Sequence, residues 1–211
     1  MASPEISVLV DLQSWPGDGA RFLDSLARHR GGRAVEVVGT HEWADLGFGA
    51  AHNRALASAS GSVVVLVDTS LELTGDLLGA LVAALDDPTV AVAGPFGLAT
   101  RDLCDYQERT GGDVAAVQGY CLAARRVDLV AAGGVHEAFN WYRNADIDVS
   151  LRLRTLGGEL RRAVAVGAGD CVRHVHRAWE ATPETERGER SRHNMGIVHA
   201  VFFGREDLVV P

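Results

Sequence analysis

Short apolar runs alternate with amphipathic stretches along the first half of the chain. β-Branched runs of this length, without polar alternation, are typical of strands buried on both faces of a sheet. The runs lie at residues 6–12, 35–38, 62–68 and 90–93. Apolar residues at helical spacing predict a helix through Phe22 that stops at Gly31, a second over 47–59, and a third over 74–87 capped by Thr74. Repeated strand–helix–strand units predict an α/β protein with a doubly wound, mostly parallel sheet.

The second half of the chain has a more mixed pattern. Residues 97–117 carry polar and glycine residues and are expected to form a connector. The later elements are expected to be a strand at 115–123, a short helix ending at 133–134, a helix at 146–156, a strand at 164–166 and a loop or surface helix at 183–194. No repeat or linker divides the sequence, so a single domain over residues 1–211 is expected.

Composition narrows the class of function. The net charge is −8 and all 20 basic residues are arginine. This charge argues against a protein that coats nucleic acid, and the lack of lysine excludes Schiff-base and Walker-type phosphate chemistry. The bias towards arginine, alanine and glycine indicates a GC-rich, bacterial genome.

The cellular location is expected to be the cytoplasm. Three scattered cysteines, Cys104, Cys121 and Cys171, are typical of a reducing compartment. The sequence contains no apolar run of about 18 residues, so no transmembrane segment is expected. Its start lacks the pattern of a secretory signal, so none is expected there.

The first candidate site residues end predicted parallel strands. Asp11 and Asp68 follow the runs at 6–12 and 62–68, and ligands of open α/β sheets bind beyond the carboxyl ends of strands. Asp68 could ligate a divalent metal or bind a sugar hydroxyl, with Ser70 and Glu72 as further oxygen donors. A single aspartate at this position more often simply ends a strand.

The second candidate is the acidic start of the helix at 146–156. Asp146 and Asp148 are two residues apart, so their side chains point about 200° apart around a helix and only one can face a given cleft. The other could complement the helix dipole. Trp141 and Tyr142, just upstream, are suitable platforms for a sugar or a base. The alternative is that both acids are ordinary residues of a helix start.

The third candidate is the histidine pair His174 and His176. Alternate positions on a strand would point both rings to one face, where they could hold a metal, with Asp68 as a possible partner. An isolated pair of this kind is more often structural. The flanking Arg173 and Arg177 could bind a diphosphate instead.

The order of these motifs resembles that of the family 2 glycosyltransferases, which have the GT-A fold. The resemblance runs from about Ile6 to Asn194. It rests on ISVLV, FLDSLARH, GFGAAHNRALASASGSVVVLVDTS, VQGYCLAARR, the GGVHEAF block, NADIDVSLRLRTLGG and RHVHRAWE. It implies a Rossmann-like half for the nucleotide sugar at 1–96 and an acceptor and catalytic half at 97–211.

The resemblance also implies roles for individual residues. Asp68 falls on the D-x-D motif that binds the metal and the nucleotide diphosphate, but the motif reads Asp68-Thr69-Ser70 and lacks its second acid. Asp146 falls on the general base of the family's E-D motif, with Ala145 in place of the usual glutamate, and Asp148 matches the second acid of E-D-x-D. The late histidine of the family, a metal or diphosphate contact, corresponds to His174 or His176.

Further matches concern the substrates. Gln118, Gly119 and Tyr120 match the strand that lines the sugar and acceptor site. The segment around Asp11 lacks the family's usual nucleotide contact, so the resemblance assigns no base.

The function implied is transfer of a sugar from a nucleotide-diphosphate sugar to an acceptor hydroxyl with inversion, assisted by Mn²⁺ or Mg²⁺. The acceptor could be a saccharide, a small molecule or a lipid-linked compound reached from the membrane surface. Two alternatives stay open: a GT-A-fold binding protein without turnover, which the missing acids favour, and a metal hydrolase built on the histidine pair and an aspartate.

Overall fold

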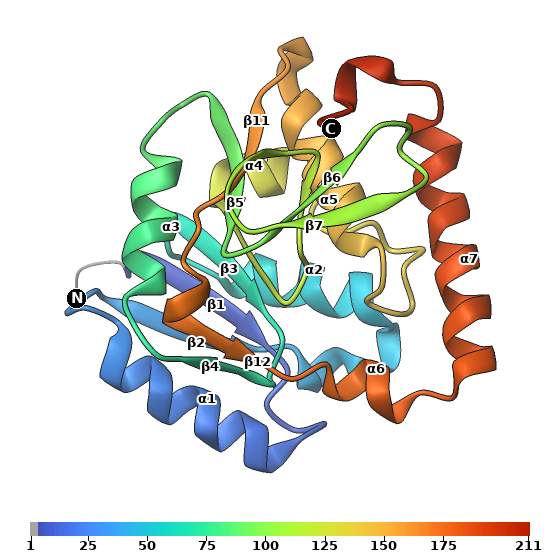
Figure 1. Ribbon diagram of the computed structural model, residues 1–211. Coiled ribbons are helices and arrows are strands. Elements are labelled where there is room, and N and C mark those ends of the chain that lie inside the picture. The colour runs from blue at the N-terminus through green and yellow to red at the C-terminus, as the bar shows by residue number, and fades with distance from the viewer. Residues whose placement is uncertain (1–3) are drawn as a thin grey trace.

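A computed structural model describes residues 4–211 of the chain, built around a seven-stranded sheet (Figure 1). The strand order is β2-β1-β3-β10-β5-β11-β8. β1, β2 and β3 are parallel to one another, β5 and β11 are parallel, and β10 and β8 run antiparallel to their neighbours. The strands are β1 (Ile6–Val10), β2 (Val35–Gly39), β3 (Val63–Val67), β5 (Val90–Gly94), β8 (Gly112–Val114), β10 (Cys121–Arg125) and β11 (Arg162–Ala165). The predicted α/β class with a doubly wound, mostly parallel sheet is therefore confirmed.

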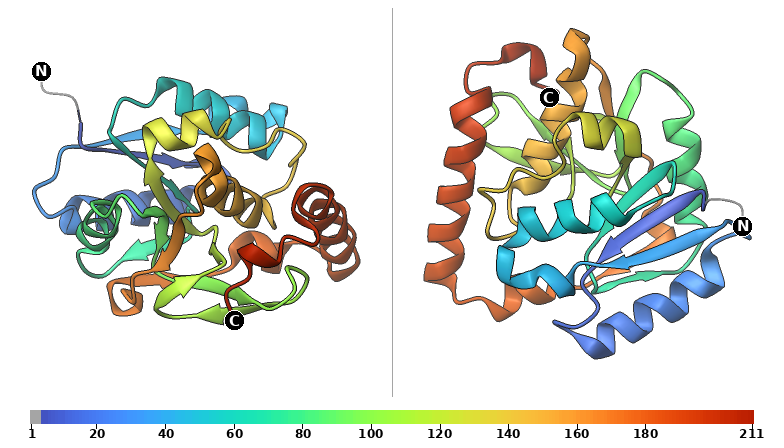
Figure 2. Two further views of the ribbon diagram at one scale, coloured as in Figure 1. Left: turned by 90° about the horizontal axis from the view of Figure 1, so that it is seen from above. Right: turned by 180° about the vertical axis from the view of Figure 1, so that it is seen from behind.

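Helices cover both faces of this sheet, and α1 and α7 lie at opposite ends of the molecule (Figure 2). The α-helices are α1 (Pro16–His29), α2 (Phe48–Ser58), α3 (Leu77–Leu85), α4 (Arg126–Ala131), α5 (Ala145–Thr155), α6 (Arg177–Ala181) and α7 (Glu184–Phe202). The 3₁₀ turns are η1 (His41–Leu46), η2 (Leu156–Gly158), η3 (Gly169–Cys171) and η4 (Glu206–Leu208). Among the described residues, none of these helices has the length and apolar character needed to cross a bilayer.

The uniformly apolar strands are explained by two cores, one on each face of the sheet. Along β3, Val64 and Leu66 pack in the core that contains α2 and α5. Val63, Val65 and Val67 pack in the core that contains α1 and α3. Because successive side chains of a strand point to opposite faces, both faces must be apolar here.

Two small sheets complete the fold and correct two predictions. β4 (Leu71–Leu73) pairs with β12 (Val172–His174), and β6 (Gly97–Thr100) lies between β7 (Tyr106–Arg109) and β9 (Ala116–Val117). The expected connector at 97–117 is thus mostly strand. The expected strand at 115–123 is interrupted at 118–120, where the chain turns from β9 into β10.

The structure corrects one helix prediction and decides between the alternatives of another. The cap of α3 is Asp76, which accepts a hydrogen bond from the Gly79 N–H at 2.9 Å, whereas the Thr74 hydroxyl donates to the Asp170 carbonyl. The charged stretch at 183–194 is the first part of α7, so the helix alternative was the correct one.

Candidate active site

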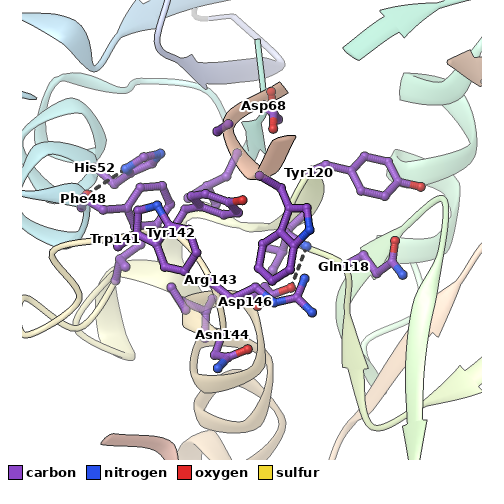
Figure 3. Close-up of a pocket in the computed structure, with 18 of the residues that line it drawn as sticks. Phe48, His52, Asp68, Gln118, Tyr120, Trp141, Tyr142, Arg143, Asn144 and Asp146 are labelled. Atoms are coloured by element: carbon purple, nitrogen blue, oxygen red, sulfur yellow. Dashed lines mark hydrogen bonds between the residues drawn. The ribbon is translucent and has the colours of Figure 1, made fainter. Parts of the chain in front are cut away.

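A cavity of about 680 Å³ lies where β1 and β3 end. Its walls come from these strand ends, the first turns of α2 and α5, the β9–β10 turn and α6 (Figure 3). Open α/β sheets bind ligands beyond the carboxyl ends of their parallel strands, because backbone and side-chain groups there are not engaged by a neighbouring strand.

Asp68 occupies the end of β3, and its carboxylate is held ionised. Both the backbone N–H and the hydroxyl of Ser70 donate to its Oδ1, at 2.8 and 2.7 Å. Its Oδ2 lies 3.2 Å from Nε2 of His174. Burial opposes ionisation, but the His174 contact and the Ser70 hydrogen bonds together lower the pKa of Asp68 below its ordinary range.

His174 is the last residue of β12, which pairing with β4 brings beside Asp68. Its ring stacks on Tyr120 with 4.3 Å between centroids, and the ring of His176 meets it edge-on at 4.5 Å. β12 ends at His174, so the two histidines do not alternate along one strand as expected; His176 precedes α6. Both ring nitrogens of His174 are buried; Nε2 faces Asp68, and Nδ1 has no hydrogen-bond partner among residues 4–211.

Asp146 lies in the first turn of α5, across the cavity (Figure 3). Its Oδ2 accepts a hydrogen bond from the Gly119 N–H at 2.8 Å. Burial raises the pKa of Asp146, and the positive charge of Arg143 opposes this rise only in part. A carboxylate with a raised pKa is a stronger base than an exposed one.

The loop before α5 is held from two sides. The N–H groups of Phe48 and Gly49, at the start of α2, donate to the carbonyls of Asn140 and Phe139. From α7, the side chain of Asn194 donates to the carbonyls of Trp141 and Arg143 at 2.9 and 2.7 Å. Asn144 adopts the left-handed conformation, φ 66°, which turns the chain into α5.

Asp148 was expected in the substrate site but lies outside the cavity. It is fully buried, and its Oδ2 accepts hydrogen bonds from Arg152 Nε and Nη2 at 2.8 and 2.6 Å. The two acids of α5 point to different surroundings, as the helical geometry predicts.

The other expected site residues divide into two groups. Those that line the cavity are Asp11, Asp68, Gln118, Gly119, Tyr120, Trp141, Asp146, His174 and His176. Ser70 does not line it, because its hydroxyl is taken up by Asp68 and the Val175 carbonyl. Arg177 is paired with Asp18, with Nε 3.0 Å from Oδ2, and the Arg173 side chain is 73% exposed and directed to Glu72. Neither arginine lines the cavity.

Trp141 is more enclosed than a free sugar platform. Its ring stacks with Trp179 at 6.1 Å and lies beneath the Arg190 guanidinium at 5.6 Å. Arg143 and Arg187 both lie 4.8 Å from the Trp179 ring. This stack joins α6, α7 and the loop before α5.

Several cavity residues escaped the sequence reasoning. Arg143 is the only arginine among the described lining residues, and Tyr106 of β7 lines the cavity together with the expected Tyr120 and Tyr142. His52 of α2 lines it as well. The tryptophan and tyrosine at 141–142 could have pointed to Arg143 as their neighbour, but His52 lies in an ordinary alanine-rich helix without a distinguishing spacing.

The donor atoms at Asp68 and His174 suit a divalent ion. Among residues 4–211, no three His, Cys, Asp or Glu side chains gather closely enough to hold a metal by themselves. The Asp68 carboxylate and the His174 imidazole lie 3.2 Å apart, close enough for both to reach one ion. Carboxylate and imidazole are ligands of Mn²⁺ and related ions, and an oxygen-rich substrate would have to supply other positions.

The comparisons with known proteins agree with this architecture. No protein-family model and no curated protein sequence matches the chain. Among solved structures it is similar to the mannosyltransferase PcManGT of Pyrobaculum calidifontis in complex with GDP-Man and Mn²⁺, with 19% identity and a TM-score of 0.56 over 77% of this chain and 55% of that one. GalNAc-T7 with UDP, GalNAc and Mn²⁺ is 13% identical, with a TM-score of 0.69 over 97% of this chain and 49% of that one.

A third similar structure is the catalytic domain of Drosophila β1,4-galactosyltransferase 7 with xylobiose, at 14% identity and a TM-score of 0.59 over 89% of this chain and 79% of that one. The chain spans about half the length of the first two proteins. At these identities the likeness concerns the fold. Together with the sheet topology it identifies the fold as GT-A, the fold of these glycosyltransferases.

Proposed function

We propose that the protein is a glycosyltransferase that moves a sugar from a nucleotide-diphosphate sugar to an acceptor hydroxyl with inversion. The observation that carries the proposal is one cavity with the ionised Asp68 beside His174 on one wall and the partly buried Asp146 on another. Asp68 and His174 are suited to hold a metal-bound diphosphate, and Asp146 is suited to act as a base.

Charge supports the involvement of a cation. The described lining residues include three aspartates, Asp11, Asp68 and Asp146, but only one arginine, Arg143. A diphosphate would enter this acidic cavity against repulsion unless a divalent ion came with it. Asp68 and His174 would hold Mn²⁺ or Mg²⁺, and the bound ion would neutralise charge on the departing diphosphate.

Asp146 is the base in the proposed reaction. The acceptor hydroxyl gives its proton to the Asp146 carboxylate while its oxygen forms a bond to the anomeric carbon. The bond from that carbon to the diphosphate oxygen breaks, and the nucleoside diphosphate leaves with the electron pair. Arg143, whose charge acts on both Asp146 and His176, is placed to stabilise the negative charge that develops.

Calorimetric titration with UDP, GDP and dTDP, each with and without Mn²⁺, tests the donor site. Metal-dependent binding of at least one nucleotide is expected. The absence of binding by all three in the presence of Mn²⁺ would contradict the proposal.

A binding protein without turnover is the second candidate. It is favoured by Ser70, whose hydroxyl is engaged by neighbours and cannot replace the missing acid of the D-x-D motif. Incubation with a bound donor and a panel of hydroxyl acceptors separates the two. Transferred sugar supports the enzyme, whereas tight nucleotide binding without sugar loss from any donor supports the binding protein.

A further inference from the structure

His52 presents a polar atom to the cavity that the proposed reaction does not use. The residue lies on α2, is 8% exposed and lines the cavity. Its Nδ1 lies 2.8 Å from the Phe48 carbonyl oxygen, and its ring lies against the Phe48 ring with 4.1 Å between centroids (Figure 3). A carbonyl oxygen only accepts, so Nδ1 carries the proton and donates it to Phe48.

The second ring nitrogen is therefore an acceptor. Burial lowers the pKa of His52 to about 4, although the Phe48 carbonyl and the charge of Asp11 both favour protonation. The ring is thus neutral near pH 7, and Nε2 keeps a lone pair. Within residues 4–211, Nε2 has no hydrogen-bond partner.

The surroundings of His52 show which part of a donor substrate belongs there. Asp11 is the carboxylate that acts on His52, and it lines the cavity with Trp15 and Thr40 at the ends of β1 and β2. The proposed reacting groups have other neighbours: Asp68 lies 3.2 Å from His174 at the end of β12, and Asp146 accepts a hydrogen bond from Gly119 in the β9–β10 turn.

We propose that Nε2 of His52 accepts a hydrogen bond from the nucleoside part of the sugar donor. This rests on the proposed function. An ionised diphosphate carries no hydrogen-bond donor and would be repelled by a lone pair beside Asp11, so it belongs at the other part, with His174 and Arg143. A nucleoside supplies donors of the required kind: the ring N–H of uracil, thymine or guanine, or a ribose hydroxyl. Trp15 adds an aromatic surface for the base.

The test compares His52→Phe, which keeps a ring but loses the acceptor, with His52→Gln, whose amide oxygen can accept. His29→Phe on α1, away from the cavity, is the matched control. Calorimetry with UDP and Mn²⁺ is expected to show at least about tenfold weaker binding for His52→Phe, partial recovery for His52→Gln and no change for His29→Phe. Inorganic pyrophosphate with Mn²⁺ reports the diphosphate part alone, and its affinity is expected to be equal in all four proteins.

Nucleotide analogues separate the two sources of the hydrogen. If the base donates, CDP binds the wild type more weakly than UDP, and His52→Phe removes this preference. If the ribose 2′-hydroxyl donates, dUDP binds the wild type more weakly than UDP does, and His52→Phe does not lower the affinity for dUDP any further. Equal binding of every nucleotide by wild type and His52→Phe overturns the proposal for His52 while leaving the proposed function intact. Failure of the wild type to bind nucleotide or pyrophosphate overturns both.

A measurement on the wild type guards against a variant that does not fold. In a ¹⁵N-labelled protein, the Nε2 resonance of His52 is expected to shift when UDP and Mn²⁺ are added, and to stay in place with pyrophosphate and Mn²⁺. An unmoved Nε2 resonance at saturating UDP overturns the proposal.

Discussion

Asp146 and Asp148, two residues apart on α5, have different surroundings. Asp146 faces the cavity and has one hydrogen bond from the Gly119 N–H. Asp148 is fully buried against Arg152. Burial without a strong cationic partner raises a carboxyl pKa and makes a base, whereas a paired carboxylate holds structure. The same substitution should therefore have opposite effects at the two positions.

Asp146→Asn is expected to lower kcat/KM about 10²–10⁴-fold, because the amide cannot take the acceptor proton. Stability should be unchanged or raised, since the surroundings that raise the pKa of Asp146 disfavour its charge and the amide oxygen can still accept from Gly119. Asp148→Asn is expected to cost about 2 kcal/mol of unfolding free energy by weakening the Arg152 contact, with kcat/KM kept. Urea unfolding and steady-state kinetics on both variants measure this; full activity in Asp146→Asn would remove it as the base.

The raised pKa of Asp146 also fixes the direction of the pH profile. A base must be unprotonated to act, so kcat/KM should fall as pH falls through this pKa, which lies above the ordinary 3.8. The pH profile of kcat/KM should keep this acidic limb in any folded variant that is less active but still has Asp146 as its base. A limb that stays flat down to the ordinary value would contradict a raised pKa in the working enzyme.

His52 should make stability depend on pH. Its pKa is about 4 in the folded chain against 6.5 ordinarily, so between these values the unfolded chain binds more protons. The contribution of the neutral ring is present above about 6.5 and is lost as pH falls towards 4, about 2 kcal/mol between pH 7 and pH 4.5. Urea unfolding of wild type and His52→Phe at pH 7 and pH 4.5 isolates the contribution of His52 to the unfolding free energy. The contributions of the other titrating groups are present in both proteins and cancel in the comparison. An equal pH dependence in the two would show that His52 is not buried neutral.

At the scale of elements, the turn between β9 and β10 contacts Asp146, the proposed base. A Cβ built on Gly119 would lie 2.9 Å from the Cβ of Asp146 and 3.1 Å from its Cγ. These distances are too short, so Gly119→Ala must displace α5 or the turn. We expect kcat/KM to fall about 10²-fold, because misplacement of a reacting group by about 1 Å has effects of that size.

The matched control for this change is Gly196→Ala on α7, where a Cβ would meet nothing within 4 Å. It should keep activity and raise stability by about 0.5–1 kcal/mol. Nucleotide affinity measured by calorimetry should survive in both variants, because the turn acts on the base and not on Asp68. Gly119→Ala with wild-type kinetics would show that the turn does not control the position of Asp146.

The same turn shows where sequence reasoning succeeded and where it failed. The central strands were predictable because they are buried on both faces, and Asp11 and Asp68 followed from the position of ligands at strand ends. The apolar run at 115–123 looked continuous, although Gln118, Gly119 and Tyr120 interrupt it. Whether such a run forms one continuous strand or two short strands joined by a turn depends on the strands that pair with it. Those partners lie far away in sequence, so a local pattern does not reveal them.

The arginines show a second reason for failure. Arg173 and Arg177 flank the histidines and were natural candidates for a diphosphate, yet Arg177 pairs with Asp18 of α1, 159 positions away. Among residues 4–211, the arginine that lines the cavity is Arg143. Which arginine remains uncompensated depends on long-range pairing, and the sequence lists charges without their partners.

For the molecule as a whole, the balance of charge in the cavity predicts a strict need for a divalent ion. Removal of metal with a chelator should abolish nucleotide binding and transfer, and Mn²⁺ should restore both. His174→Ala should weaken metal-dependent nucleotide binding about tenfold or more, because it removes one of the two close donor atoms. Arg173→Ala, one residue earlier on the same strand but exposed and outside the cavity, is the control and should bind as the wild type does. If His174→Ala retained full Mn²⁺-dependent affinity, the ion would have to sit elsewhere. Nucleotide binding by the wild type without any metal would instead assign charge compensation to Arg143, since no other described arginine lines the cavity.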